Sequence, residues 1–68
     1  MQLVINGEPR ELPEETTVSQ MLEHLKVIPE RVVVEVHLTI LKRAQHATTL
    51  LREGDQVEIV QFIGGGSR

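Results

Sequence analysis

The sequence predicts an α+β domain in which one main helix packs on one face of a mixed sheet of four to five strands. Two patterns carry this prediction. Apolar and polar residues alternate near both ends of the chain, which is the period of half-buried strands. Between them, residues 18–25 carry apolar side chains at the spacing of one helical stripe. The 68 residues suffice for one small domain.

The first expected element is a β-hairpin. Residues Gln2–Asn6 alternate in polarity and form the first strand. Asn6-Gly7 favours a two-residue type I′ turn because both residues tolerate positive φ. Residues Glu8–Leu12 then return as the second strand. Pro9 places that strand at a sheet edge, since proline has no N–H to donate to a ladder.

The helix is expected over Val18–Lys26. Thr17 precedes it and Gln20 lies three residues further on, which is the signature of a capping box. Pro29 follows shortly after, as is typical beyond a helix end. His24 lies on the polar side and is interpreted as solvated surface. The apolar stripe consists of Val18, Met21, Leu22 and Leu25.

The second half of the chain alternates short strands with turns. The expected elements are strands over Arg31–Val36, Thr39–Leu41 and Val57–Ile63, a helical turn over Arg43–Thr48 and a tight turn at Glu53-Gly54-Asp55. The turn at His37-Leu38 is unusual, because neither residue type favours a hairpin turn.

A single helix can cover only one face of the sheet, which leaves the other face open. If the first and last strands pair, the open face carries Val4, Val60 and Phe62. Exposed apolar patches are frequently interaction sites, although scattered exposed apolar residues are also normal. These three residues are therefore the candidate partner-binding surface.

Composition argues against several classes of function. The formal net charge is −3 and Phe62 is the single aromatic residue, which disfavours nucleic-acid binding. Without cysteine, neither a disulfide nor a thiolate zinc site can form. The sequence contains no pattern typical of a signal peptide or membrane span, so we expect a cytoplasmic, soluble protein.

The histidines and serines do not form a recognisable catalytic or metal-binding pattern. His24, His37 and His46 fall in three different elements without ligand spacing, so no metal site is expected. We expect His46 to be a surface or capping residue. Ser19 and Ser67 are assigned no catalytic role.

The last strand runs directly into Gly64, Gly65 and Gly66. Glycine loses the most backbone entropy on ordering, so this run favours neither strand nor helix. We therefore divide the chain into a domain over residues 1–63 and a flexible tail over residues 64–68. Such a tail is either presented to another molecule or is a frayed terminus.

Several motifs together resemble the ubiquitin-like sulfur carriers, and most closely the ThiS family of thiamin biosynthesis, with the MoaD-like carriers as nearest relatives. The resemblance covers essentially the whole chain. Its motifs are Ile5-Asn6-Gly7-Glu8, Thr17-Val18, Ile40-Leu41-Lys42-Arg43, Glu53-Gly54-Asp55-Gln56-Val57-Glu58-Ile59 and the closing glycines.

This resemblance implies a β-grasp fold and a carrier that is not itself an enzyme. The carboxylate of the terminal glycine, here Gly66, would be adenylated by an E1-like, ThiF-like adenylyltransferase that uses ATP and Mg²⁺. A sulfur donor system would convert the acyl adenylate to a thiocarboxylate. A ThiG-like thiazole synthase would then take the sulfur. The carrier would bind no cofactor of its own.

The sequence departs from the family pattern at two places. Ser67-Arg68 follow Gly66, so its carboxylate is held in a peptide bond. A protease removes these two residues, or they are appended linker residues, or this homologue does not carry sulfur. His37-Leu38-Thr39 stands where the family more often has an Asn-Gly-type turn. The alternatives left open are a MoaD-like carrier for molybdopterin synthesis, a protein modifier joined through Gly66, and a non-catalytic interaction module.

Overall fold

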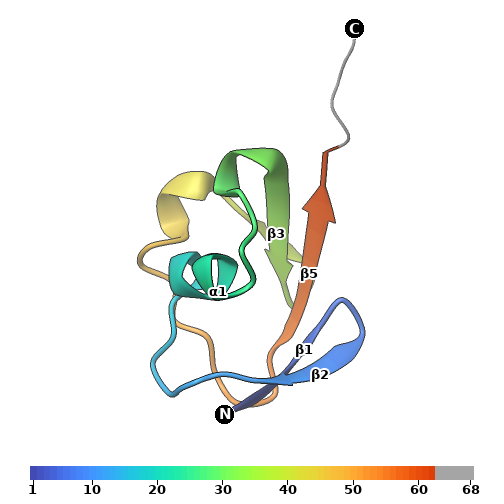
Figure 1. Cartoon of the computed structure of the whole chain (residues 1–68), viewed down its shortest axis with the longest axis vertical. Helices are drawn as coiled ribbons and strands as arrows, with labels where there is room; N and C mark the ends of the chain where they lie inside the picture. The colour runs from blue at the N-terminus through green and yellow to red at the C-terminus, as the bar shows by residue number, and fades with distance from the viewer. Residues whose placement is uncertain (63–68) are drawn as a thin grey trace, which may run out of the picture.

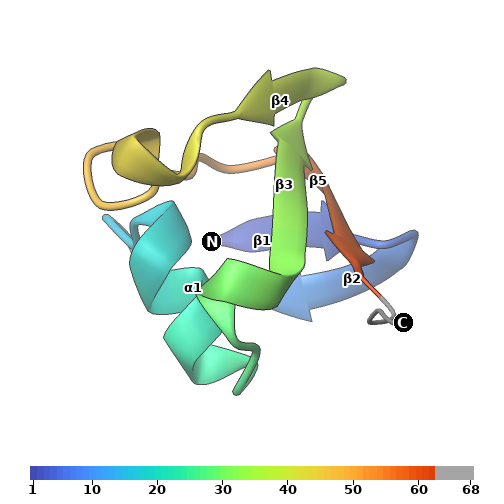
Figure 2. The ribbon, with the colours of Figure 1, turned by 90° about the horizontal axis from the view of Figure 1, so that it is seen from above.

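The computed structural model describes residues 1–62, in which five strands form one mixed sheet with a single α-helix on one face (Figures 1 and 2). The sheet order is β2-β1-β5-β3-β4. The strands are β1 (Gln2–Ile5), β2 (Glu8–Glu11), β3 (Val32–Val36), β4 (Thr39–Leu41) and β5 (Gln56–Gln61). The helix α1 spans Val18–His24, and the 3₁₀ turns η1 and η2 span Pro29–Arg31 and Arg43–Gln45. The predicted fold class is confirmed.

The first hairpin follows the predicted pattern. Asn6 and Gly7 both have positive φ, 51° and 80°, as a type I′ turn requires. β2 is an edge strand and carries Pro9, as expected. β1 then pairs in parallel with β5, through Val4 opposite Gln56 and Ile5 opposite Val57. This pair makes the sheet mixed and places the first and last strands side by side within it.

The helix begins with the predicted capping box. Thr17 Oγ1 accepts a hydrogen bond from the Gln20 amide at 3.1 Å, and Gln20 Oε1 accepts one from the Thr17 amide at 2.9 Å. The helix ends earlier than predicted, because Lys26 adopts a left-handed φ of 60°. The Lys26 and Val27 amides donate to the carbonyls of Glu23 and Leu22. This arrangement is a Schellman motif with lysine where glycine is usual.

The core lies between α1 and the sheet. The helix contributes Val18, Met21 and Leu22, which are fully buried. The remaining buried apolar residues come from the strands and loops: Leu3, Ile5, Leu12, Val32, Val34, Leu51 and Val57. Within residues 1–62, no helix is long and apolar enough to cross a bilayer.

The hairpin between β3 and β4 forms despite its sequence. His37 and Leu38 both adopt left-handed φ, 50° and 67°, which costs an L-residue about 1–2 kcal/mol each. His37 Nε2 lies 2.7 Å from Asp55 Oδ1, and the His37 amide donates to the Gln56 carbonyl at 2.9 Å. Asp55 also accepts from the Arg52 amide at 2.8 Å. Contacts with residues 52–56 therefore hold the turn in place.

His46 was predicted to be a surface or capping residue; it is the C-cap of η2, but it is not a surface residue, because it is only 4% exposed. Its backbone carbonyl accepts the Ser19 amide at 2.9 Å, which draws the segment after η2 under the start of α1. Neither ring nitrogen has a hydrogen-bond partner among the described residues. Burial, and to a lesser degree the neighbouring charge of Arg43, lowers the pKa of His46 below its usual 6.5.

The lowered pKa of His46 predicts that the folded state loses stability in mild acid. Below pH 6.5 the unfolded chain takes up a proton that the folded chain does not, so the free energy of unfolding falls as the pH drops toward the lowered pKa. Urea unfolding between pH 7.5 and 5.5 measures this slope. His46→Gln should flatten it, whereas His24→Gln, a change at an exposed helix position, should leave it intact. An equal slope in the wild type, His46→Gln and His24→Gln would show that His46 does not cause the loss of stability in acid.

Candidate functional site

The candidate site is the end of β5, from which the chain continues into the glycine run. β5 pairs antiparallel with β3 along its length, from Val57 opposite Val36 to Gln61 opposite Val32. The Phe62 amide extends this ladder by donating to the Arg31 carbonyl at 2.8 Å. The arrow of β5 points away from the N-terminus (Figure 1). The strand therefore leaves the domain from the middle of the sheet and at its far end.

The predicted reacting tail, Gly64, Gly65 and Gly66, lies outside the described residues. The structure describes the base of that tail through Phe62. The role assigned to Gly66 stays a prediction.

Two of the three predicted partner-binding residues lie together on the open face. Val60 and Phe62 are 50% and 56% exposed and alternate with the core-facing positions of β5. Val4 is half-buried and lies opposite Gln56, four residues before Val60, which is about 13 Å along the strand. The parallel register thus separates Val4 from the other two.

Two further residues of this face were not predicted from the sequence. Val33 lies directly opposite Val60, and Ile40, 63% exposed, lies opposite Glu35 on the neighbouring strand. The pairing of Val33 with Val60 follows from the register of β3 with β5, which alternation within one strand does not show. We call Val33, Val60 and Phe62 the open-face cluster.

Two carboxylates lie beside the open-face cluster. Glu35 on β3 is directly opposite Glu58 on β5. Like charges directly opposite each other on one sheet face are destabilising. A basic side chain from a partner would relieve this repulsion, so the pair favours a partner surface that combines apolar and basic residues.

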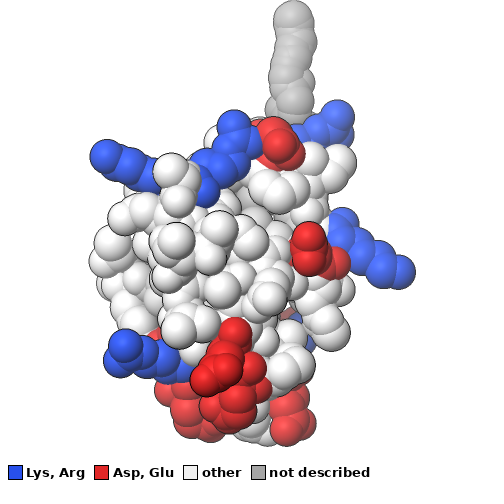
Figure 3. Space-filling view, turned by 90° about the vertical axis from the view of Figure 1, so that its left-hand side faces the viewer, with Lys and Arg blue, Asp and Glu red and all other residues white. Residues whose placement is uncertain are grey.

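Charge is unevenly distributed along the molecule. On the face in Figure 3, Lys and Arg side chains gather mostly at the end toward which β5 points, and Asp and Glu side chains mostly at the opposite end. At the β5 end, Arg43 pairs with Glu30 at 3.6 Å and so links η2 to η1. Within residues 1–62, no three His, Cys, Asp or Glu side chains are grouped so that they could hold a metal ion.

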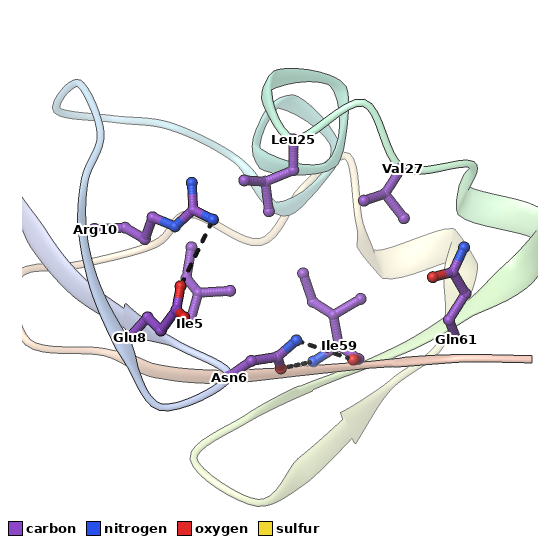
Figure 4. A pocket seen from close by; sticks show the side chains of 8 residues that line it. All are labelled: Ile5, Asn6, Glu8, Arg10, Leu25, Val27, Ile59 and Gln61. Carbon is purple, nitrogen blue, oxygen red and sulfur yellow. Dashed lines mark hydrogen bonds and ion pairs between the residues drawn. The ribbon is translucent and has the colours of Figure 1, made fainter.

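A hollow of about 340 Å³ opens beside β5, on the side of the sheet that α1 covers (Figure 4). It lies between the end of α1 and the first hairpin. The Asn6 side chain borders it and binds the β5 backbone, with Oδ1 accepting from the Ile59 amide at 2.7 Å and Nδ2 donating to the Ile59 carbonyl at 3.3 Å. Its lining residues are Ile5, Asn6, Glu8, Arg10, Leu25, Val27, Ile59 and Gln61.

Comparison with solved structures agrees with this architecture. The chain is similar to the crystal structure of the thiamine biosynthesis protein (ThiS) from Geobacter metallireducens, with a TM-score of 0.85 and 38% sequence identity. The match covers 97% of this chain and all of that one. The β-grasp fold expected from the sequence is thereby confirmed.

Comparison with curated proteins gives two relatives named thiazole synthase. The one from Paramagnetospirillum magneticum is 45% identical over 67 residues, and the one from Magnetococcus marinus is 39% identical over 66 residues. These matches cover 98% and 97% of this chain, but the chain spans only about a fifth of either relative.

The family comparison covers nearly the whole chain. Residues 3–66 match the ThiS family, so the match includes every strand residue except Gln2, the helix and the three glycines. The sequence, the fold and the solved relative therefore agree that this chain belongs to the ThiS family of sulfur carrier proteins.

Proposed function

We propose that this chain carries sulfur for thiazole formation in thiamin biosynthesis, as a thiocarboxylate on Gly66. The observation that carries the proposal is the family match, which runs through β5 and ends at Gly66. The end of β5 supports it, because the strand leaves the middle of the sheet at the end of the domain (Figure 1). A tail that starts there can enter a partner while the folded body stays outside.

The chemistry requires activation, because a free carboxylate is a poor acyl donor. On an adenylyltransferase with ATP and Mg²⁺, a Gly66 carboxylate oxygen attacks the α-phosphorus and pyrophosphate leaves. Hydrosulfide supplied by the donor system then attacks the carbonyl carbon, the new C–S bond replaces the C–O bond to the phosphate, and AMP leaves. The thiocarboxylate that remains delivers its sulfur to thiazole synthase. This chain contributes the carboxylate and a tail without side chains, which permits close approach of enzyme groups to the backbone.

The proposal requires a free carboxylate at Gly66, whereas Ser67-Arg68 follow it in this sequence. We include hydrolysis of the Gly66–Ser67 peptide bond as the first step. Hydrolysis leaves the carboxylate on Gly66 and releases the dipeptide.

Thiazole synthase is the acceptor that the relatives support. A segment similar to this chain makes up about a fifth of two proteins that are named thiazole synthase. The match to the ThiS family likewise favours a thiazole acceptor over molybdopterin synthesis.

The folded body must supply most of the affinity, because ordering a glycine tail on binding costs entropy. The open-face cluster is the surface that we assign to this contact. It exposes Phe62 beside the tail and has the opposed Glu35 and Glu58 at its border. We expect the adenylyltransferase to meet it with apolar residues and at least one Lys or Arg.

The end of the chain should decide whether adenylation occurs. A chain that ends at Gly66 should support release of pyrophosphate from ATP by the adenylyltransferase. A chain that ends at Gly65 should not, since its carboxylate stops one residue, about 3.5 Å, short of the reaction site. The full chain to Arg68 should be inactive until it is cleaved. All three should unfold at the same urea concentration, and equal activity of all three would exclude this mechanism.

Phe62→Ala should weaken binding more than it weakens the fold. Phe62 is half exposed, so we expect the free energy of unfolding to change by less than about 1 kcal/mol, whereas the affinity for the adenylyltransferase should fall about tenfold or more. Titration calorimetry and urea unfolding measure the two quantities. Leu38→Ala is the matched control, because Leu38 is an 87% exposed apolar residue at the other end of β3. Equal affinity of wild type and Phe62→Ala would remove the open-face cluster from the proposal.

A further inference from the structure

β5 is paired on both sides where it begins but on one side only where it ends. Toward β3, the ladder continues to the Phe62 amide and the Arg31 carbonyl. Toward β1, strand pairing stops at Val57, and the Asn6 side chain occupies the next place by binding both backbone groups of Ile59. Beyond Ile59, no described strand pairs with β5 on the β1 side.

The alternation of the ladder identifies which backbone groups are unpaired. In an antiparallel pair, every second residue exchanges hydrogen bonds with its partner strand. The Phe62 amide bonds on the β3 side, to the carbonyl of Arg31 just before that strand, whereas Val57 and Ile59 bond to Asn6 on the other side. The N–H and C=O of Gln61 therefore point away from β3, toward the side on which no described strand pairs with β5 beyond Val57.

The hollow adjoins this unpaired edge. The apolar side chains of Leu25, Val27 and Ile59 form one part of its wall, and the hairpin contributes Glu8 and Arg10 (Figure 4). The Glu8–Arg10 ion pair is long, 3.9 Å, and exposed, so it is easily rearranged. A strand placed 4.8 Å from β5 at Gln61 would direct every second side chain into this hollow.

We propose that an extended segment of the enzyme that holds the tail adds to β5 at Gln61 and places an apolar side chain in the hollow. This inference rests on the proposed function. An enzyme that encloses Gly64–Gly66 must extend along the chain directly after Phe62. On the side that faces β3, the backbone is already paired as far as Phe62, whose amide bonds to the Arg31 carbonyl. The side that faces away from β3 is therefore the one available to a partner. Main-chain hydrogen bonds would supply affinity and the hollow would supply specificity.

A second copy of this chain is a poorer occupant. The unpaired edge within the described residues offers one donor and one acceptor, which is far less than a stable dimer needs. The outer edge of β2 is also a poorer place for an added strand, because Pro9 has no N–H and its neighbours are charged.

Gln61→Pro tests the inference in the chain that ends at Gly66. Proline removes the N–H that points away from β3. The N–H groups of β5 that point toward β3 are unchanged. We expect affinity for the adenylyltransferase to fall roughly fivefold or more by titration calorimetry. Gln61→Ala is the matched reference, because it also loses the long side chain that lines the hollow but keeps the N–H, so Gln61→Pro should bind roughly fivefold or more weakly than Gln61→Ala.

Amide hydrogen exchange of the wild-type chain gives a second readout that needs no variant. The Gln61 amide should exchange rapidly in the free chain and at least tenfold more slowly in the complex. Normal binding and adenylation with an unprotected Gln61 amide would overturn this inference alone. Absence of any binding by the chain that ends at Gly66 would overturn the proposed function as well. Protection that grows with concentration in the free chain would indicate a second copy and overturn the assigned occupant.

Discussion

The parallel pairing of β1 with β5 is the constraint on which the rest of the structure depends. It joins the first and last strands at the middle of the sheet, through Ile5 opposite Val57, both of which are buried in the core. The Asn6 side chain extends this pairing to Ile59 without another strand. β5 is therefore fixed on both sides where it crosses the core and on one side where it leaves. This asymmetry gives the tail a rigid base and leaves one edge of that base accessible.

Elements with local signals were predictable from the sequence, and elements held by distant contacts were not. Thr17 and Gln20 form the capping box that fixes the start of α1, and Asn6-Gly7 determines the first turn. The His37-Leu38 turn has no local signal, since its partner Asp55 lies 18 residues away. Burial of His46 likewise depends on the contact between η2 and the start of α1, which no local pattern indicates.

Only part of the candidate site was predicted from the sequence, because strand register, like the other long-range contacts, has no local signal. Alternation along the last strand correctly placed Val60 and Phe62 on the open face. The register of a long-range strand pair cannot be read from alternation, so Val4 was grouped with them, although it lies opposite Gln56. The opposed Glu35 and Glu58 became visible only through the register of β3 with β5. The chemistry assigned to Gly66 rests on the family match and on the position of the tail's base.

The most direct test of the account is the intact mass of this protein isolated from its own host. The account predicts a species that ends at Gly66, part of which is heavier by the exchange of one oxygen for sulfur. This fraction should decrease when the adenylyltransferase gene is deleted. A species that ends only at Arg68, without a sulfur-containing form, would leave the Gly66 carboxylate in a peptide bond and contradict the carrier mechanism.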